Sequence, residues 1–227
     1  MMKLRVPVVL LFWVIIGLVS TPSAALAGAE QDATETGRLL AILLDSGRVT
    51  VGANQALIND AAKGDKGFTP EVFEKQLVEK FKERSGVDLA NLKSANAPET
   101  AKKLLPQLVE ASKLTVAENQ STINKKGVGF KGFAPATFGT KAAAKFSSKA
   151  GVYLKQTTHD GLLRTPANKA DGFEAGVLQK FADPGYPRQG EKIISEAAEG
   201  GKILRVMLPL YYGKGCLACH GEPKGEK

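Results

Sequence analysis

Cysteine and histidine are scarce in this sequence. Its 227 residues include two cysteines, Cys216 and Cys219, and two histidines, His159 and His220. A closed tetrahedral zinc site needs four such ligands, so it would use all of them, and the neighbours Cys219 and His220 would strain the chain if both bound one ion. The composition therefore disfavours a zinc site of this kind.

A basic run interleaved with aromatic residues is also absent. The chain contains 31 basic and 23 acidic residues, and its net charge of +8 is spread along the whole sequence. Proteins that bind nucleic acid usually concentrate positive charge on one segment or face. We therefore expect no nucleic-acid partner and a solvated, mildly basic surface.

The N-terminal residues have the pattern of an export signal. The segment 1–5 is short and basic, and residues 6–19 form an almost unbroken apolar run. Small residues occupy the two positions before the cut after Ala27 that a signal peptidase reads. The apolar run is too short to span a bilayer comfortably. We expect residues 1–27 to be a signal peptide that is cleaved after about Ala27, which places the mature protein in the periplasm. An uncleaved signal segment would be its only contact with a membrane.

A second pattern is an internal repeat. Residues 39–89 align without a gap on residues 104–154, and 20 of the 51 aligned positions are identical. Chance would give roughly one identity in sixteen, so the sequence predicts a duplication. The pair Asn54-Gln55 recurs as Asn119-Gln120. We interpret these polar residues as groups that fix a helix against a loop, which we consider a better explanation than ligand contacts.

Each copy predicts two helices separated by a loop rich in glycine and lysine. Apolar residues at three- and four-residue spacing predict first helices over about 33–60 and about 98–124. Thr69 and Pro70 then have the pattern of an N-cap and first-turn proline, which opens a helix over 71–84 that ends at Gly86. We expect Val72, Phe73, Leu77 and Phe81 to face inward, and Pro135 and residues 138–146 to play these parts in the second copy.

The remaining sequence predicts a small sheet. Residues 152–158 are rich in β-branched and aromatic side chains and favour a strand, and residues 173–181 favour a short helix. Residues 192–197 and 202–212 flank a Gly-Gly turn and predict a hairpin. Helices followed by an antiparallel sheet indicate the α+β class, with long N-terminal helices packed on the sheet. We divide the mature chain into a helical region, 28–96, and a second domain, 97–227.

Both cysteines lie in one short motif, Cys216-Leu-Ala-Cys219-His220. C-x-x-C-H is the signature of covalent haem attachment, in which the two thiols add to the vinyl groups and the adjacent imidazole binds the iron. A thiol–disulfide exchange site also uses C-x-x-C, but it prefers a helix N-terminus in a thioredoxin-type unit, which this sequence does not indicate. We therefore expect one covalently bound haem c, with Cys216, Cys219 and His220 as its attachment and metal-binding residues.

The sequence leaves the second axial ligand open. His159 is the only other histidine, and Met207 is the other soft donor, although a methionine in an apolar strand usually fills a core. Water or no ligand is a further alternative. Two protein ligands would favour electron transfer, whereas an open iron would favour binding of a small diatomic gas.

Several further segments resemble a known family. They are Lys155-Gln-Thr-Thr158, Arg164-Thr-Pro166-Ala-Asn168, Phe173-Glu174 and residues 209–223 around the motif. In this order they are similar to the bacterial PAS-like mono-haem c-type cytochrome domain. The resemblance covers roughly residues 98–227, and the preceding repeat is similar to an extra helical region of some members. It implies a PAS-like sheet, His220 as the proximal iron ligand, and Arg164 in a loop near the haem. Arg164 or Arg205 could then pair with a propionate.

The resemblance implies redox sensing or small-gas sensing, and the alternative is a soluble periplasmic electron carrier with a redox partner. An enzyme such as a peroxidase would need a distal acid–base residue, for which His159 is the sole candidate, so we expect no catalytic activity. An open edge of the predicted sheet would accept a second copy of the chain as a homodimer.

Overall fold

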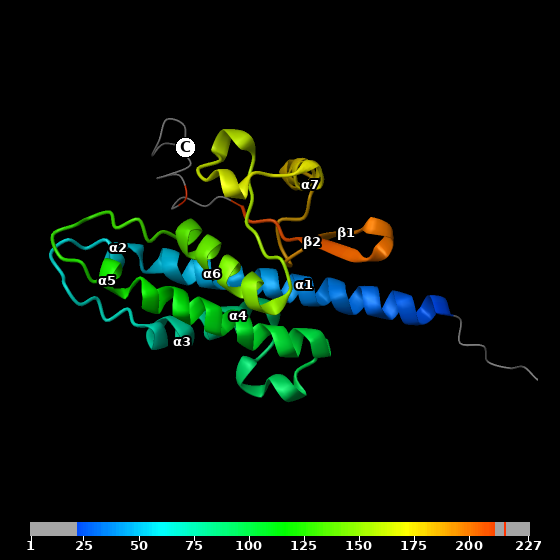
Figure 1. Ribbon diagram of the computed structural model, residues 1–227, viewed down its shortest axis with the longest axis horizontal. Coiled ribbons are helices and arrows are strands. Elements are labelled where there is room, and N and C mark those ends of the chain that lie inside the picture. The colour runs from blue at the N-terminus through cyan, green and yellow to red at the C-terminus, as the bar shows by residue number, and fades with distance from the viewer. Residues whose placement is uncertain (1–21, 212–215, 217–227) are drawn as a thin grey trace, which may run out of the picture.

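Four long helices form an up-and-down bundle in the computed structural model, which describes residues 22–211 and Cys216 (Figure 1). They are α1 (Pro22–Ala53), α3 (Pro70–Ser85), α4 (Glu99–Glu118) and α6 (Pro135–Ala150). Helices α1 and α4 each contact the other three, so they form the central pair and α3 and α6 flank them. The predicted domain boundary at 96/97 falls between the short η1 (Leu89–Ser94) and α4, within the bundle.

Each predicted first helix is interrupted by an asparagine. After Asn54 the chain continues as the short α2 (Gln55–Ile58), and after Asn119 as α5 (Gln120–Ile123). The Asn54 amide donates to the Thr50 carbonyl at 2.8 Å, and the Asn119 amide donates to the Thr115 carbonyl at 2.7 Å. Because these side chains satisfy carbonyls in the last turn, they stabilise the point where the long helix ends.

The predicted signals at the ends of α3 are confirmed. The Thr69 hydroxyl accepts from the Val72 backbone N–H, and Gly86 ends the helix with a φ of 75°, which glycine adopts without steric cost. Phe73 and its neighbours one and two turns on are buried as predicted, but Val72 is 40% exposed, so its inward placement was wrong. Val72 lies about 100° around the helix from Phe73, outside the face that Phe73, Leu77 and Phe81 define.

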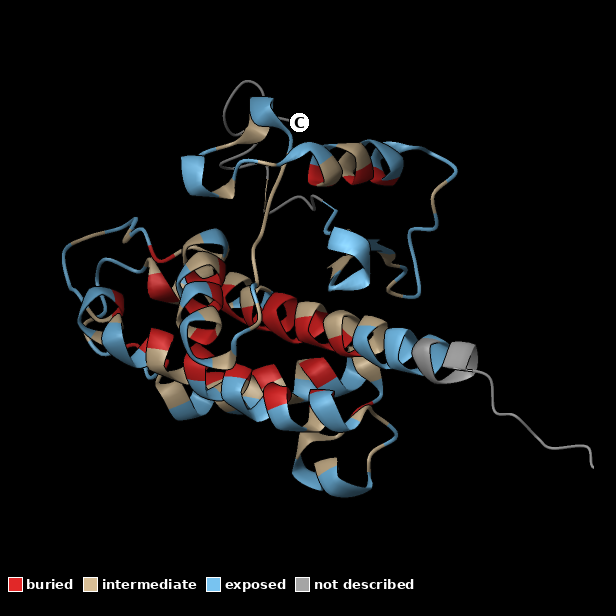
Figure 2. Cartoon of the chain, turned by 45° about the vertical axis from the view of Figure 1, so that its right-hand side comes forward, coloured by how far each residue is buried: buried red, intermediate tan, exposed pale blue. Residues whose placement is uncertain are grey.

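Most buried side chains lie inside the bundle (Figure 2). Its loop end is filled by four phenylalanines. The rings of Phe68 and Phe73 are 6.1 Å apart, those of Phe73 and Phe138 are 5.1 Å apart, and those of Phe133 and Phe138 are 6.4 Å apart. Two of these rings come from helices and two from loops, so the same cluster holds the helices together and fixes the loops.

The two helical hairpins also exchange hydrogen bonds. The Gln55 amide donates to the Phe133 carbonyl at 2.9 Å, and the Gln120 amide donates to the Phe68 carbonyl at 3.2 Å. The partners in the second bond lie 65 positions from those in the first, so each hairpin supports the loop of the other in the same way. The interpretation of the Asn-Gln pair as a helix-to-loop contact is confirmed for both glutamines.

A smaller unit follows the bundle. It contains α7 (Gly172–Ala182) and an antiparallel hairpin of β1 (Ile194–Ala198) and β2 (Ile203–Met207), in which Ile194 pairs with Met207. Two short helical turns precede α7, η2 (Asp160–Leu162) and η3 (Pro166–Asn168), and a third, η4 (Glu199–Gly201), connects β1 to β2. The predicted helix and hairpin are confirmed, although β2 ends earlier than predicted. Among the described residues, no helix is both long and apolar enough to cross a membrane.

The strand predicted over 152–158 was wrong. That segment makes only an isolated bridge between Thr158 and Lys169. The Gln156 amide instead donates to the Ala136 carbonyl at 2.6 Å and to the Thr140 hydroxyl at 2.7 Å, which ties the segment to α6 through a side chain. The described residues are therefore mainly helical with a two-stranded sheet, which agrees with the α+β class but does not show a PAS-like sheet.

The hairpin packs directly on α1. A Cβ atom added at Gly37 would lie 2.8 Å from Cγ2 of Val206, so glycine is needed where β2 crosses the helix. The side chain of Arg84 on α3 donates to Glu191 and to Asp45, each at 2.9 Å, which joins the segment before β1 to two helices. The smaller unit is thus held against the bundle by close packing and by partly buried ion pairs.

Candidate functional site

The chain approaches the C-x-x-C-H motif along a segment anchored to α7. After β2, the Tyr211 hydroxyl donates to the Phe181 carbonyl at 3.4 Å. The Phe181 ring packs edge-on against Tyr186 with the centroids 5.0 Å apart, and burial raises the pKa of Tyr186. The hydrogen bond of Tyr211 therefore fixes the chain five residues before Cys216, the first residue of the motif.

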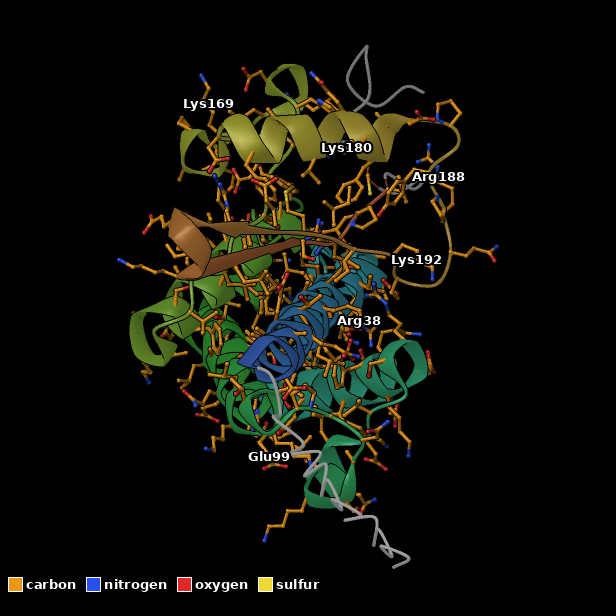
Figure 3. The ribbon with its side chains drawn as sticks, turned by 90° about the vertical axis from the view of Figure 1, so that its right-hand side faces the viewer. Arg38, Glu99, Lys169, Lys180, Arg188 and Lys192 are labelled. Atoms are coloured by element: carbon orange, nitrogen blue, oxygen red, sulfur yellow. The ribbon has the colours of Figure 1, made fainter. Side chains whose placement is uncertain are left out.

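An arginine lies beside this anchor. The guanidinium of Arg188 lies 4.1 Å from the centre of the Tyr211 ring. Figure 3 shows Arg188 beyond the end of α7, where the chain turns back toward β1. No acidic side chain of the described residues forms an ion pair with Arg188, so its charge is not balanced there. Sequence reasoning missed this residue because no motif marks it and the fold alone brings it beside Tyr211.

Arg205, by contrast, already has protein partners. Its guanidinium lies 2.6 Å from the Asp171 carboxylate and 4.4 Å from the centre of the Phe173 ring. The hydrogen bond from Arg205, with a second from the Glu174 backbone, holds the pKa of Asp171 below its usual value. Glu174 is nearly buried and also pairs with Lys155 at 2.8 Å. Arg205 therefore holds β2 against α7, and two carboxylates balance its charge.

The loop that carries the other predicted site residues is fixed to α6. His159 precedes η2, Arg164 lies between η2 and η3, and both are exposed. Pro166 and Asn168 begin and end η3, and the Asn168 amide donates to the Thr140 hydroxyl at 3.3 Å. Asn168 and Pro166 thus shape a turn, while iron binding by His159 and haem contact by Arg164 stay predictions.

Two of the remaining predicted residues, Met207 and Cys216, lie near the C-terminal end of the described residues. Met207 is the last residue of β2 and is half-buried, and Cys216 is partly exposed. Cys219 and His220 lie outside the described residues. Their roles as attachment and iron-binding residues rest on the motif alone.

The residues around the anchor fit a flat apolar cofactor. Leu210 is 40% exposed and Tyr211 is 39% exposed, although both are large apolar or aromatic side chains. A haem attached through this motif would need apolar contacts and a cation for a propionate, and Leu210, Tyr211 and Arg188 are groups of these kinds. Among the described side chains, no group of three or more His, Cys, Asp or Glu could hold a metal ion.

The fold is thus a helical bundle with a small α+β unit, and the C-x-x-C-H motif follows this unit in the sequence. The family model described as Tll0287-like matches residues 29–227, so the chain belongs to this family of cytochrome-like domains. The match covers the bundle, the smaller unit and the motif, and extends well beyond the resemblance noted over 98–227. No curated protein and no solved structure matches the chain.

Proposed function

We propose that this protein is an exported mono-haem cytochrome of the c type. Cys216 and Cys219 form the two thioether bonds, and the His220 imidazole binds the iron. The single observation that carries the proposal is the C-x-x-C-H motif, which lies inside the segment matched by a family of cytochrome-like domains. When bound, the haem supplies an iron that alternates between the ferric and ferrous states.

The residues around the motif have separate roles in this proposal. Tyr211, held by Phe181, fixes the direction from which the motif leaves the smaller unit. Leu210 and Tyr211 would supply apolar contacts that exclude water from a bound haem, and Arg188 would neutralise a propionate. Arg164 remains a second candidate for that contact, because it is exposed in the loop that the family resemblance places near the haem.

Among the functions of such a protein, we favour sensing of redox state or of a small diatomic gas. The supporting observation is the contact between Val206 and Gly37, which joins the strand leading to the motif to the longest helix of the bundle. A carrier that only exchanges electrons would not need this connection. The alternative is a soluble periplasmic electron carrier, and we propose no enzymatic activity for either.

Optical spectra of the protein from cells that mature c-type cytochromes test both the covalent haem and the choice between sensor and carrier. Oxidised, reduced and reduced carbon monoxide-treated samples should show a haem that stays with the polypeptide under denaturing conditions. A ferrous form that binds carbon monoxide supports sensing, whereas a low-spin form that ignores it supports the carrier. Colourless protein with free or mutually paired Cys216 and Cys219 would overturn the proposal.

Variants assign the ligands. Cys216→Ser and Cys219→Ser should each leave at most one thioether, which shifts the spectrum of the haem in alkaline pyridine. His159→Ala tests the second axial ligand, and Met207→Leu is its matched alternative. If neither changes the ferrous spectrum, the second axial position is not filled by either side chain. Mass spectrometry of the mature chain tests cleavage after Ala27 and export to the periplasm.

A further inference from the structure

The two loops at one end of the bundle share a common frame. Residues 59–69 and 124–134 occupy matching places in the two hairpins, at the end opposite the start of α1 (Figure 1). Each contains a buried phenylalanine, Phe68 or Phe133, that follows a glycine with positive φ. The Lys66 backbone N–H donates to Asn124, and the Lys131 backbone N–H donates to Asn59. Positions in one loop can therefore be compared directly with positions in the other.

Two acidic residues of the first loop have structural roles. The Asp60 carboxylate accepts from the backbone N–H groups of Ala62 at 2.8 Å and Lys63 at 3.2 Å, and the Asp65 carboxylate accepts from that of Gly67 at 2.9 Å. Such bonds stabilise tight turns. The corresponding residues of the second loop, 65 positions on, are Lys125 and Phe130. The second loop thus replaces two turn-forming acids with a base and an aromatic residue.

The replacements face solvent. Phe130 is 68% exposed, and Lys125 and Lys126 are also exposed, with no ion pair to an acidic side chain of the described residues. Residues 124–134 contain three lysines and no acid, whereas residues 59–69 contain two lysines and two aspartates. Because an aspartate occupies the place of Phe130 in the matching loop, the shared frame does not require an aromatic residue there. The loop therefore presents one apolar ring together with cations that no described carboxylate neutralises.

We propose that the loop of residues 124–134 docks on a membrane surface that carries anionic phospholipid headgroups. The Phe130 ring enters the boundary between headgroups and acyl chains, and Lys125 and Lys126 contact the phosphates. The loop projects from the end of a long bundle, so it reaches a surface without obstruction from α7 or the hairpin (Figure 1). A protein partner fits less well, since a stable interface usually buries about 800 Å² on each side, more than one projecting loop offers.

Sedimentation with vesicles tests the docking surface. Mature holoprotein is mixed with vesicles of phosphatidylcholine alone or with added phosphatidylglycerol, at low salt and at about 0.5 M NaCl, where exposed charges are strongly screened. We expect binding to the anionic vesicles only, and its loss at high salt. Phe130→Asp, which restores the residue type of Asp65, should weaken binding at least about tenfold. Lys125→Asp, which restores that of Asp60, should weaken it about fivefold or more.

A matched control shows whether vesicle binding needs an aromatic residue in this loop or any exposed aromatic residue of the protein. Tyr153 is 77% exposed and lies outside the loop, so Tyr153→Asp should sediment as the wild type does. Phe130→Trp gives a reporter, because Trp13 is the only tryptophan of the chain and lies in the expected signal peptide. Its emission should be quenched by brominated acyl chains, and that of Tyr153→Trp should not be.

Three outcomes would overturn the proposal. They are wild-type protein that stays in the supernatant with anionic vesicles, equal binding to neutral vesicles, and Phe130→Asp protein that binds as the wild type does. The circular dichroism spectrum shows whether each variant folds. If Phe130→Asp does not fold, Lys125→Asp decides the question, because Lys125 is exposed and the matching position already carries an aspartate.

Discussion

Phe73 and Phe138 meet inside the loop end of the bundle, with ring centroids 5.1 Å apart and the planes inclined by 57°. One ring belongs to α3 and the other to α6, and both side chains are fully buried. The two residues occupy matching positions of the two hairpins, 65 residues apart. They are therefore the point at which the flanking helices, which lie on opposite sides of the central pair, touch each other.

Loss of either ring should destabilise the whole bundle. We expect Phe73→Ala and Phe138→Ala each to lower the free energy of unfolding by about 3–5 kcal/mol, since a large cavity remains in a tightly packed core. The double variant should lose less than the sum, because the first substitution already removes the contact. Urea denaturation measures all three, with the exposed Val72→Ala as a control that should change stability by at most about 0.5 kcal/mol. Additive losses would show that the two rings are not coupled.

Two glycines of α1 should respond to alanine in opposite directions. Gly37→Ala places a methyl group 2.8 Å from the stiff side chain of Val206, so we expect a loss of about 1–3 kcal/mol. At Gly52 the nearest atom would be 3.4 Å away, and alanine favours a helix, so Gly52→Ala should be neutral or stabilising by up to about 1 kcal/mol. Thermal unfolding compares the two. Equal effects would argue against the close contact of β2 with α1.

The Asp171–Arg205 pair predicts a dependence of stability on pH. Arg205 lowers the pKa of Asp171 below 3.8, its value without these contacts, so folding favours the ionised carboxylate. The stabilisation is fully present above that ordinary value and is lost as the pH falls through the lower pKa of the folded protein. We expect Arg205→Met to lose less stability than wild type between pH about 5 and pH about 2. Urea denaturation across this range measures the pH dependence of the free energy of unfolding for both proteins. When both also carry Asp171→Asn, the difference between them should disappear.

Arg188 should raise the midpoint reduction potential of the haem if the proposed function is right. Removing a cation near the haem favours the oxidised iron, so Arg188→Gln should lower the midpoint potential by on the order of tens of millivolts. Potentiometric titration of the visible spectrum measures the shift. Lys103→Gln, on an exposed position of α4, removes the same charge as a control and should leave the potential unchanged. An equal shift in both variants would mean that Arg188 acts only through net charge.

Local signals allowed much of the fold to be predicted. The cap at Thr69 and the glycine at Gly86 mark the ends of α3 because each satisfies backbone groups within a few residues. The hairpin was predictable for the same reason, since the Gly-Gly turn defines it locally. The segment 152–158 was not, because the Gln156 bonds to α6 outweigh its strand propensity and cannot be read from neighbouring residues.

The candidate site also has a part that the sequence predicts and a part that only the fold brings together. The C-x-x-C-H motif is contiguous and was predictable, whereas the group formed by Phe181, Arg188 and Tyr211 was not. Tyr211 follows Arg188 by 23 residues, and it reaches Phe181 and Arg188 only because α7 and the segment after β2 fold together. The sequence makes Arg205 a candidate for a propionate contact, but only the structure identifies its carboxylate partners, Asp171 and Glu174.

The exchanged glutamine bonds have a mechanical consequence. Separation of the two hairpins breaks both bonds. The Phe133 carbonyl loses its donor Gln55, and the Phe68 carbonyl loses its donor Gln120. Each loop thus loses one hydrogen bond when the hairpins separate, which disfavours an intermediate with a single intact hairpin. The four helices should be lost together, and the slowest-exchanging amides in all of them should report the same free energy of opening.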